Sequence, residues 1–167
     1  TDLERTQHFQ GLFSGVTNLL LLAQDEAQLT TEFCRLLVEK GNYLLAWIGA
    51  GIDDDDKNIR PLAVYGQNMG YVYGQQKSWA SSIERGPVNE ALKSGLASVI
   101  RDIQSTEELQ GQRGEYIGRE IKSLLAIPLR VDQATSSALV IYSDSSKAFA
   151  DNETSWLADL ANSMSMG

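Results

Sequence analysis

Side chains able to act as nucleophiles, general bases or metal ligands are scarce in this chain of 167 residues. His8 is the only histidine and Cys34 the only cysteine. A nucleophile–base pair or a zinc site therefore lacks the residues that it needs. We interpret His8 as a surface or interface residue, and Cys34, beside Phe33, as a buried small hydrophobe. Neither catalysis nor metal binding is expected, and a lone cysteine excludes an internal disulfide.

Two polar segments were considered as ion-binding sites. Residues 53–56 are four consecutive aspartates, but an EF-hand loop counted from Asp53 needs Gly at its sixth and Glu at its twelfth position. Those positions hold Asn58 and Val64, so a solvated hairpin turn is the better interpretation. Residues 85–87, Arg-Gly-Pro, place a cation beside a helix start, which suits an anion. A glycine turn followed by proline in the first helical turn is favoured there.

Composition limits the partners. The net charge is −8, from 14 Lys and Arg against 22 Asp and Glu. Nucleic acids and anionic membranes attract clustered positive charge, so neither is expected as a partner. No apolar run reaches the ~18 residues of a spanning helix, and no signal peptide is evident. We expect one cytoplasmic domain, cut from a longer protein because the chain begins with Thr and ends within an apparent helix.

Apolar periodicity predicts three helices. Apolar residues recur at steps of three and four over residues 9–23 and over residues 28–40, and again at the end of the chain. Residues of suitable type stand at the ends of these segments. They are Thr30 or Thr31 as the N-cap of the second helix, Gly41 and Asn42 as its stop, and Asp151 or Asn152 as the cap of the last.

Short apolar runs between turn residues predict the strands. They cover residues 43–50, 59–65, 98–101, 121–131 and 137–143. The first is apolar on both faces and should be central, whereas Pro61 assigns the second to an edge. A short polar connection joins the last two as a hairpin. The fold class is therefore α+β: an antiparallel sheet of five or six strands with helices on one face.

The order of these segments resembles that of the GAF domain, in the subgroup often found beside diguanylate cyclases and sensor histidine kinases. The likeness spans residues 29–161, and it implies a single domain, with residues 1–27 as an N-terminal dimer or signalling helix and 28–167 as the core. The matching motifs are YLLAWIG (43–49), RPLAVYG (60–66), Gly70 and Tyr71, RGP (85–87), Ala91 and Leu92 with Gly95, SLLAIPL (123–129), ALVIYS (138–143) and Phe149.

The resemblance implies a small-molecule pocket on the sheet face away from the terminal helices. Aromatic walls with a few polar handles suit an organic ligand, but the same residues can instead fill a closed core, and both alternatives stand. Ser136 and Ser137 occupy positions ahead of the closing strand where relatives usually have Gly, so a differently shaped hairpin is expected. The candidate ligand-binding residues are Tyr71, Trp79, Arg85, Asp102 and Tyr116.

Known activities of the GAF family can be compared with this sequence directly. Covalent bilin attachment needs a Cys in the pocket region, and no Cys or His follows Cys34. Haem ligation is not expected because His is so scarce. The Asn-Lys…Phe…Asp-Glu signature of cyclic-nucleotide-binding members is absent, and methionine-sulfoxide reductases of this fold need several cysteines. No cofactor is expected.

The terminal helices carry more apolar surface than one sheet face requires, which favours a homodimer over stripes that only cover the sheet. The resemblance then implies a sensory domain that passes a ligand signal through these helices to an output domain, such as a diguanylate cyclase or kinase. The alternative is an interaction module with a self-filled pocket; an enzyme is least favoured. The expected dimer residues are Phe9, Leu12, Phe13, Val16, Leu20, Leu160 and Met164.

Overall fold

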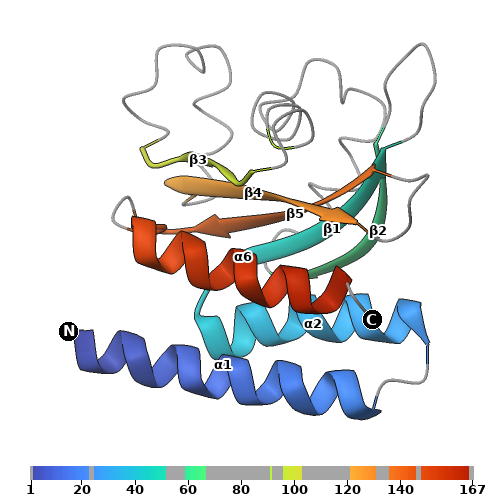
Figure 1. Cartoon of the computed structure of the whole chain (residues 1–167). Coiled ribbons are helices and arrows are strands. Elements are labelled where there is room, and N and C mark those ends of the chain that lie inside the picture. The colour runs from blue at the N-terminus through green and yellow to red at the C-terminus, as the bar shows by residue number, and fades with distance from the viewer. Residues whose placement is uncertain are drawn as a thin grey trace.

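The computed structural model describes residues 2–22, 25–51, 59–66, 91, 96–102, 121–130, 136–145 and 148–165. Three helices and five strands occupy these parts of the chain (Figure 1). In chain order they are α1 (Asp2–Leu22), α2 (Glu26–Gly41), β1 (Leu45–Gly51), β2 (Ile59–Gly66), β3 (Ser98–Ile100), β4 (Ser123–Arg130), β5 (Ser136–Ser143) and α6 (Asp151–Ser165).

The strands form one antiparallel sheet in the order β2-β1-β5-β4-β3. β1 is paired on both sides, as its two apolar faces predict. β2 lies at one edge of the described sheet, which confirms the assignment made from Pro61. Pro61 lies opposite Gly49, where the β1–β2 register shifts, so the residue without an N–H coincides with an irregularity in the ladder.

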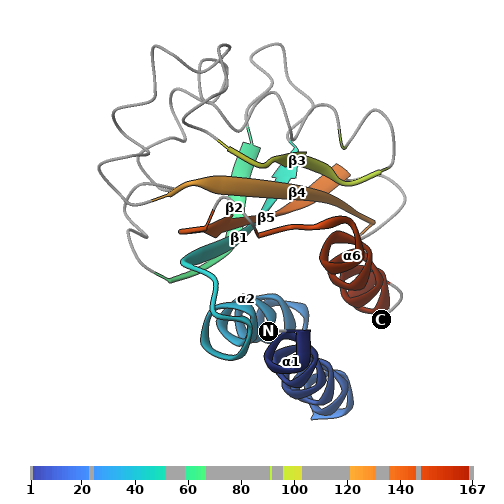
Figure 2. The same ribbon diagram turned by 90° about the vertical axis from the view of Figure 1, so that its left-hand side faces the viewer.

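All three described helices lie on one side of the sheet (Figures 1 and 2). α2 packs on β1 and β2, and α6 packs on β4. α1 lies outside α2 and contacts α2 and α6, so it forms an outer layer. The predicted α+β fold with N- and C-terminal helices on one face is confirmed.

The ends of α2 differ in how well the sequence predicted them. Asn42 follows the helix with φ 62°, the left-handed conformation of a C-terminal stop, and confirms the predicted end. The predicted N-cap is wrong, because Asp25 caps the helix and its carboxylate accepts the N–H of Gln28 at 2.7 Å. Thr30 lies inside the helix and is buried.

Alternation along β5 divides the core into two apolar clusters, one on each face of the sheet. Leu139 and Ile141 face the helices, whereas Val140 and Tyr142 face the opposite side. All four side chains are buried. We call these two surfaces the helix face and the far face.

Two buried serines of the sheet differ in their hydrogen bonding. The Ser123 hydroxyl donates to the carbonyl oxygen of Ser145 at 2.7 Å. Ser137 is equally buried, but its Oγ has no hydrogen-bond partner among the described residues. A buried hydroxyl that has lost water without gaining a partner lowers stability.

We therefore predict opposite effects for the same change at these two positions. Ser137→Ala should leave the free energy of unfolding unchanged or raise it by about 1 kcal/mol, because it removes an unsatisfied hydroxyl. Ser123→Ala should lower it by about 1 kcal/mol, because the carbonyl of Ser145 loses its donor. Urea denaturation of both variants measures the difference. An equal loss in both would contradict the prediction.

Candidate functional site

The far face of the sheet is the candidate functional surface. Its described side chains come from four strands and from residues beside them, and they are apolar and largely buried. Ala91, from outside the sheet, is fully buried against them. The cluster consists of Leu45, Trp47, Val64, Ala91, Ile121, Leu124, Ala126, Ala138, Val140 and Tyr142, with Leu44 and Ile100 at its margin.

Strand register arranges this surface as rows of decreasing side-chain size. The largest side chains lie toward the start of β1, and the smallest lie toward its end. The far face therefore has small residues near the end of β1 and aromatic and branched residues near its start. The rows are Leu45, Tyr142 and Leu124; then Trp47, Val140 and Ala126; then Gly49, Ala138 and Pro128.

A buried hydrogen bond fixes the two aromatic side chains of this face. The Trp47 indole Nε1–H donates to the Tyr142 hydroxyl at 2.9 Å. Because Trp47 pairs with Val140 across β1 and β5, this contact runs diagonally between neighbouring rows. Buried Trp and Tyr side chains that satisfy each other can present their ring faces to an apolar or aromatic partner without an unpaired polar atom.

Of the five candidate ligand-binding residues, the structure describes Asp102 alone. Asp102 is half-buried, and it follows β3 two positions after Ile100, which packs at the margin of the far face. The other four candidates, Tyr71, Trp79, Arg85 and Tyr116, lie outside the described residues, as do the aspartates at 53–56. Trp47 and Tyr142 of the far face were not predicted as site residues, because both lie within apolar runs that predict strands of the hydrophobic core.

The chemistry of the described residues is poor in reactive groups. Cys34 is fully buried, and burial raises the pKa of its thiol to about 12. The thiolate, which is the nucleophilic form, is therefore scarce at neutral pH. No group of three His, Cys, Asp or Glu side chains within the described ranges is arranged to hold a metal ion.

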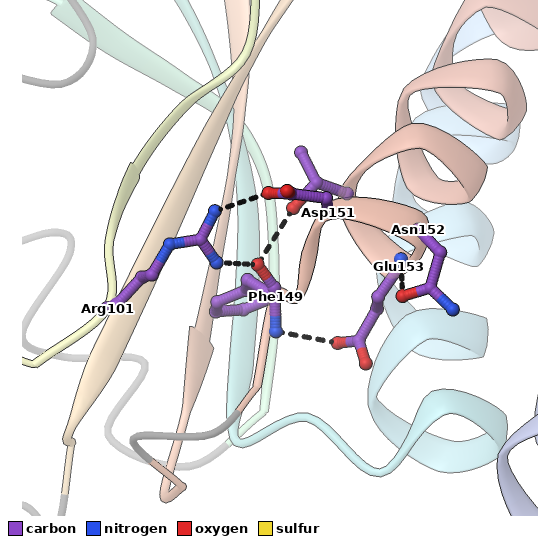
Figure 3. Close-up of polar contacts among 6 residues, drawn as sticks. Arg101, Phe149, Asp151, Asn152 and Glu153 are labelled. Carbon is purple, nitrogen blue, oxygen red and sulfur yellow. Dashed lines mark hydrogen bonds and ion pairs between the residues drawn. The ribbon is translucent and has the colours of Figure 1, made fainter. Parts of the chain in front are cut away.

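A polar cluster surrounds the start of α6 (Figure 3). Arg101, just after β3, donates to the carbonyl oxygen of Phe149 and pairs with the Asp151 carboxylate at 2.8 Å. The buried Glu153 carboxylate accepts the Phe149 N–H at 3.1 Å and the Tyr43 hydroxyl at 2.9 Å. The sequence did not reveal this cluster, because its members come from three separate segments.

This cluster also corrects the predicted cap of the last helix. Asp151 or Asn152 was predicted to cap α6, but both lie within the helix, and the Asp151 carboxylate pairs with Arg101. The Asn152 side chain accepts the N–H of its neighbour Glu153 at 2.9 Å. The carbonyl oxygen of Ala150 accepts the N–H of Thr154, so the helical bonding begins one residue earlier.

The residues predicted for a dimer contact divide into three groups. Leu12, Val16 and Leu160 are buried in the helix-face core of their own chain, so a partner chain cannot reach them. Phe13 is 60% exposed and Leu20 37% exposed, and α1 also exposes two further leucines. Phe9 and Met164 lie in α1 and α6, but their side chains lie outside the described set. The further exposed leucines are Leu21 and Leu22.

Comparison with protein families identifies the fold. A GAF domain family model matches residues 23–167. Since the match covers most of the chain, the chain belongs to the GAF domain family. GAF domains are generally regulatory. Comparison with curated proteins finds no match.

Solved structures with the same fold include GAF domains and an enzyme. The GAF domain region of a Geobacter sulfurreducens protein is 22% identical with a TM-score of 0.68, covering 90% of this chain and 95% of that one. Free methionine-R-sulfoxide reductase of Neisseria meningitidis is 13% identical with a TM-score of 0.69, covering 98% and 89%. The nlh2 GAF domain of A. Aeolicus is 16% identical with a TM-score of 0.65, covering 95% of this chain and 94% of that one. At these identities the likeness shows the fold alone.

The Trp47–Tyr142 bond gives a test of the far face as a built surface. Tyr142→Phe removes the acceptor of a buried indole N–H and should lower the free energy of unfolding by about 1–3 kcal/mol. Tyr65→Phe is the matched control, since the Tyr65 hydroxyl also hydrogen-bonds, to Glu39 at 2.8 Å, but in an exposed setting. Its loss should be smaller in urea denaturation. Equal losses would mean that the far-face bond is not specially buried.

Proposed function

We propose that this chain is a non-catalytic sensory domain that binds a small organic molecule at the far face and signals through its terminal helices. The observation that supports this best is the far face itself, where buried aromatic and small side chains lie on the side of the sheet opposite to all the described helices. Such a surface fits an apolar or aromatic molecule.

The polar handles for this molecule come from the segments around the far face. By resemblance we assign Tyr71, Trp79, Arg85, Asp102 and Tyr116 to ligand binding. The apolar floor favours the ring or hydrocarbon part of a ligand, and the handles would hold its polar groups. The domain would use no cofactor, neither a covalent bilin nor a haem.

A non-enzymatic role is supported by the residues available. Some proteins of this fold are enzymes, as the Neisseria reductase shows. This chain has one cysteine, and its thiol is buried with a raised pKa, so it lacks the several reactive thiols of that chemistry.

The proposed signalling role is supported by the proteins in which similar folds occur. Similar folds occur in a domain of a Sinorhizobium meliloti two-component sensor histidine kinase protein and in the GAF domain of a Coxiella burnetii phosphoenolpyruvate-protein phosphotransferase. We propose that the chain is part of a longer cytoplasmic signalling protein whose output is a diguanylate cyclase, a kinase or a similar effector, and these neighbours support that proposal.

Ligand binding is tested by thermal shift against a panel of metabolites and nucleotides. A compound at 100 times its dissociation constant should stabilise the fold by about 2.7 kcal/mol. Ala138→Val, which enlarges a side chain in the small-residue row, should reduce the shift of a far-face ligand. Ala158→Val makes the same change on α6 and should leave it unchanged. If no compound raises the midpoint, an interaction module with a self-filled far face becomes the better reading.

We further propose that two copies associate through α1. One side of this helix packs in the core of its own chain through Leu12 and Val16, and the adjoining flank leaves the large apolar side chains of Phe13 and Leu20 exposed. Phe13 and Leu20 lie seven residues apart and therefore share one side of the helix. Since α1 forms the outer layer of the fold, a second copy can reach this side.

The dimer is tested by light scattering. The wild-type chain should have twice its mass of 18.4 kDa. Phe13→Glu with Leu20→Glu should give the monomer, because charges at the contact lose hydration on association. Leu96→Glu is the control, since Leu96 is 69% exposed but lies outside α1. A wild-type monomer at high concentration would contradict the proposal.

A further inference from the structure

The polar cluster around the start of α6 joins β3, at one edge of the described sheet, to the helices. Arg101 is its link, because it immediately follows β3 and both of its acceptors lie at α6 (Figure 3). We propose that Arg101 is a positioning residue that couples the packing of the far face to the first turn of α6. The coupling serves the sensory function proposed above and rests on it for the nature of the input.

β3 is suited to move in response to the far face. It has three residues, and among the described strands it is paired only with β4. Val99 packs at the helix face and Ile100 at the far face. Asp102, a candidate ligand handle, comes next after Arg101. A change at the far face that displaces Ile100 therefore also displaces the Arg101 side chain.

Phe149 is the element at α6 that receives this displacement. Its side chain is fully buried and stacks on Tyr43, with 5.6 Å between the ring centroids. Its backbone φ of 63° lies in the left-handed region, which is disfavoured for a residue with a Cβ. The backbone N–H and the carbonyl oxygen of Phe149 are both hydrogen-bonded to side chains. Glu153 accepts its N–H, while Arg101 and Thr154 donate to its carbonyl oxygen. Such a conformation persists only while its surroundings impose it.

The strengths of these contacts suit a device that can be released without unfolding. The side chains of the Arg101–Asp151 pair are 48% and 98% exposed, so that pair is weak and sensitive to salt. The Phe149 ring, Tyr43 and Glu153 are buried and hold the junction in place. A ligand whose affinity differs modestly between two positions of β3 can therefore shift the Arg101 contacts.

The test uses hydrogen exchange and no ligand. Ile100→Ala, or the milder Ile100→Val, perturbs the far face beside Leu124. In the wild-type background either change should raise exchange of the Thr154 amide relative to the Leu37 amide in α2, by about fivefold for the alanine variant, the lower end of typical coupling between sites. In the Arg101→Gln background the same change should have an effect below about twofold.

Arg35→Gln is the matched control. Arg35 also forms exposed ion pairs, with Glu32 and Glu39, but both of these partners lie in α2 and not in β3 or α6. In its background the Ile100 effect on Thr154 should persist in full. An equal Ile100 effect with and without Arg101, or no Ile100 effect at all, overturns the coupling. That result leaves ligand binding intact, just as an empty ligand screen leaves the coupling intact, so the two failures are distinguishable.

Discussion

The structure depends on burying both faces of its central strands. β5 lies at the middle of the sheet, with Leu139 and Ile141 on one face and Val140 and Tyr142 on the other, all of them nearly inaccessible to water. Each such side chain contributes about 1.5–3 kcal/mol when it is removed from water. Neither face can therefore remain uncovered. The helices cover one face, and the requirement for cover on the other makes that face a place where a small molecule can contribute to the packing.

The two faces of the sheet differ in the side chains that they carry. The helix face is filled by large aliphatic and aromatic side chains of α2, such as Phe33 and Leu37, and it holds Cys34 in an environment that raises its pKa. The far face combines small residues with a Trp47–Tyr142 pair whose polar atoms satisfy each other. The first is a structural core. The second combines graded side-chain size with two buried aromatic rings joined by a hydrogen bond, and the proposed ligand site rests on these features.

The sequence predicted those features that depend on local pattern. Two-sided apolar strands, the edge position of Pro61 and the stop at Asn42 follow from alternation, a missing donor and left-handed backbone. Partners distant in the sequence could not be predicted: periodicity marked Leu12 and Val16 as apolar without saying that α2 covers them. The Arg101–Asp151 pair joins residues 50 apart, and no local pattern links them. Four ligand candidates rest on the family resemblance alone.

α1 packs in the core of its own chain and also carries the exposed residues of the proposed dimer contact. Its mean hydropathy is similar around the helix, unlike the one-sided patterns of α2 and α6. α2 and α6 pack directly on the strands and cover the sheet, whereas α1 packs on these two helices from outside. The exposed apolar flank of α1, with Phe13 and Leu20, is therefore not needed to cover the sheet. Because α6 contacts α1 and its first residue pairs with Arg101, a continuous chain of contacts runs from β3 at the margin of the far face through α6 to α1.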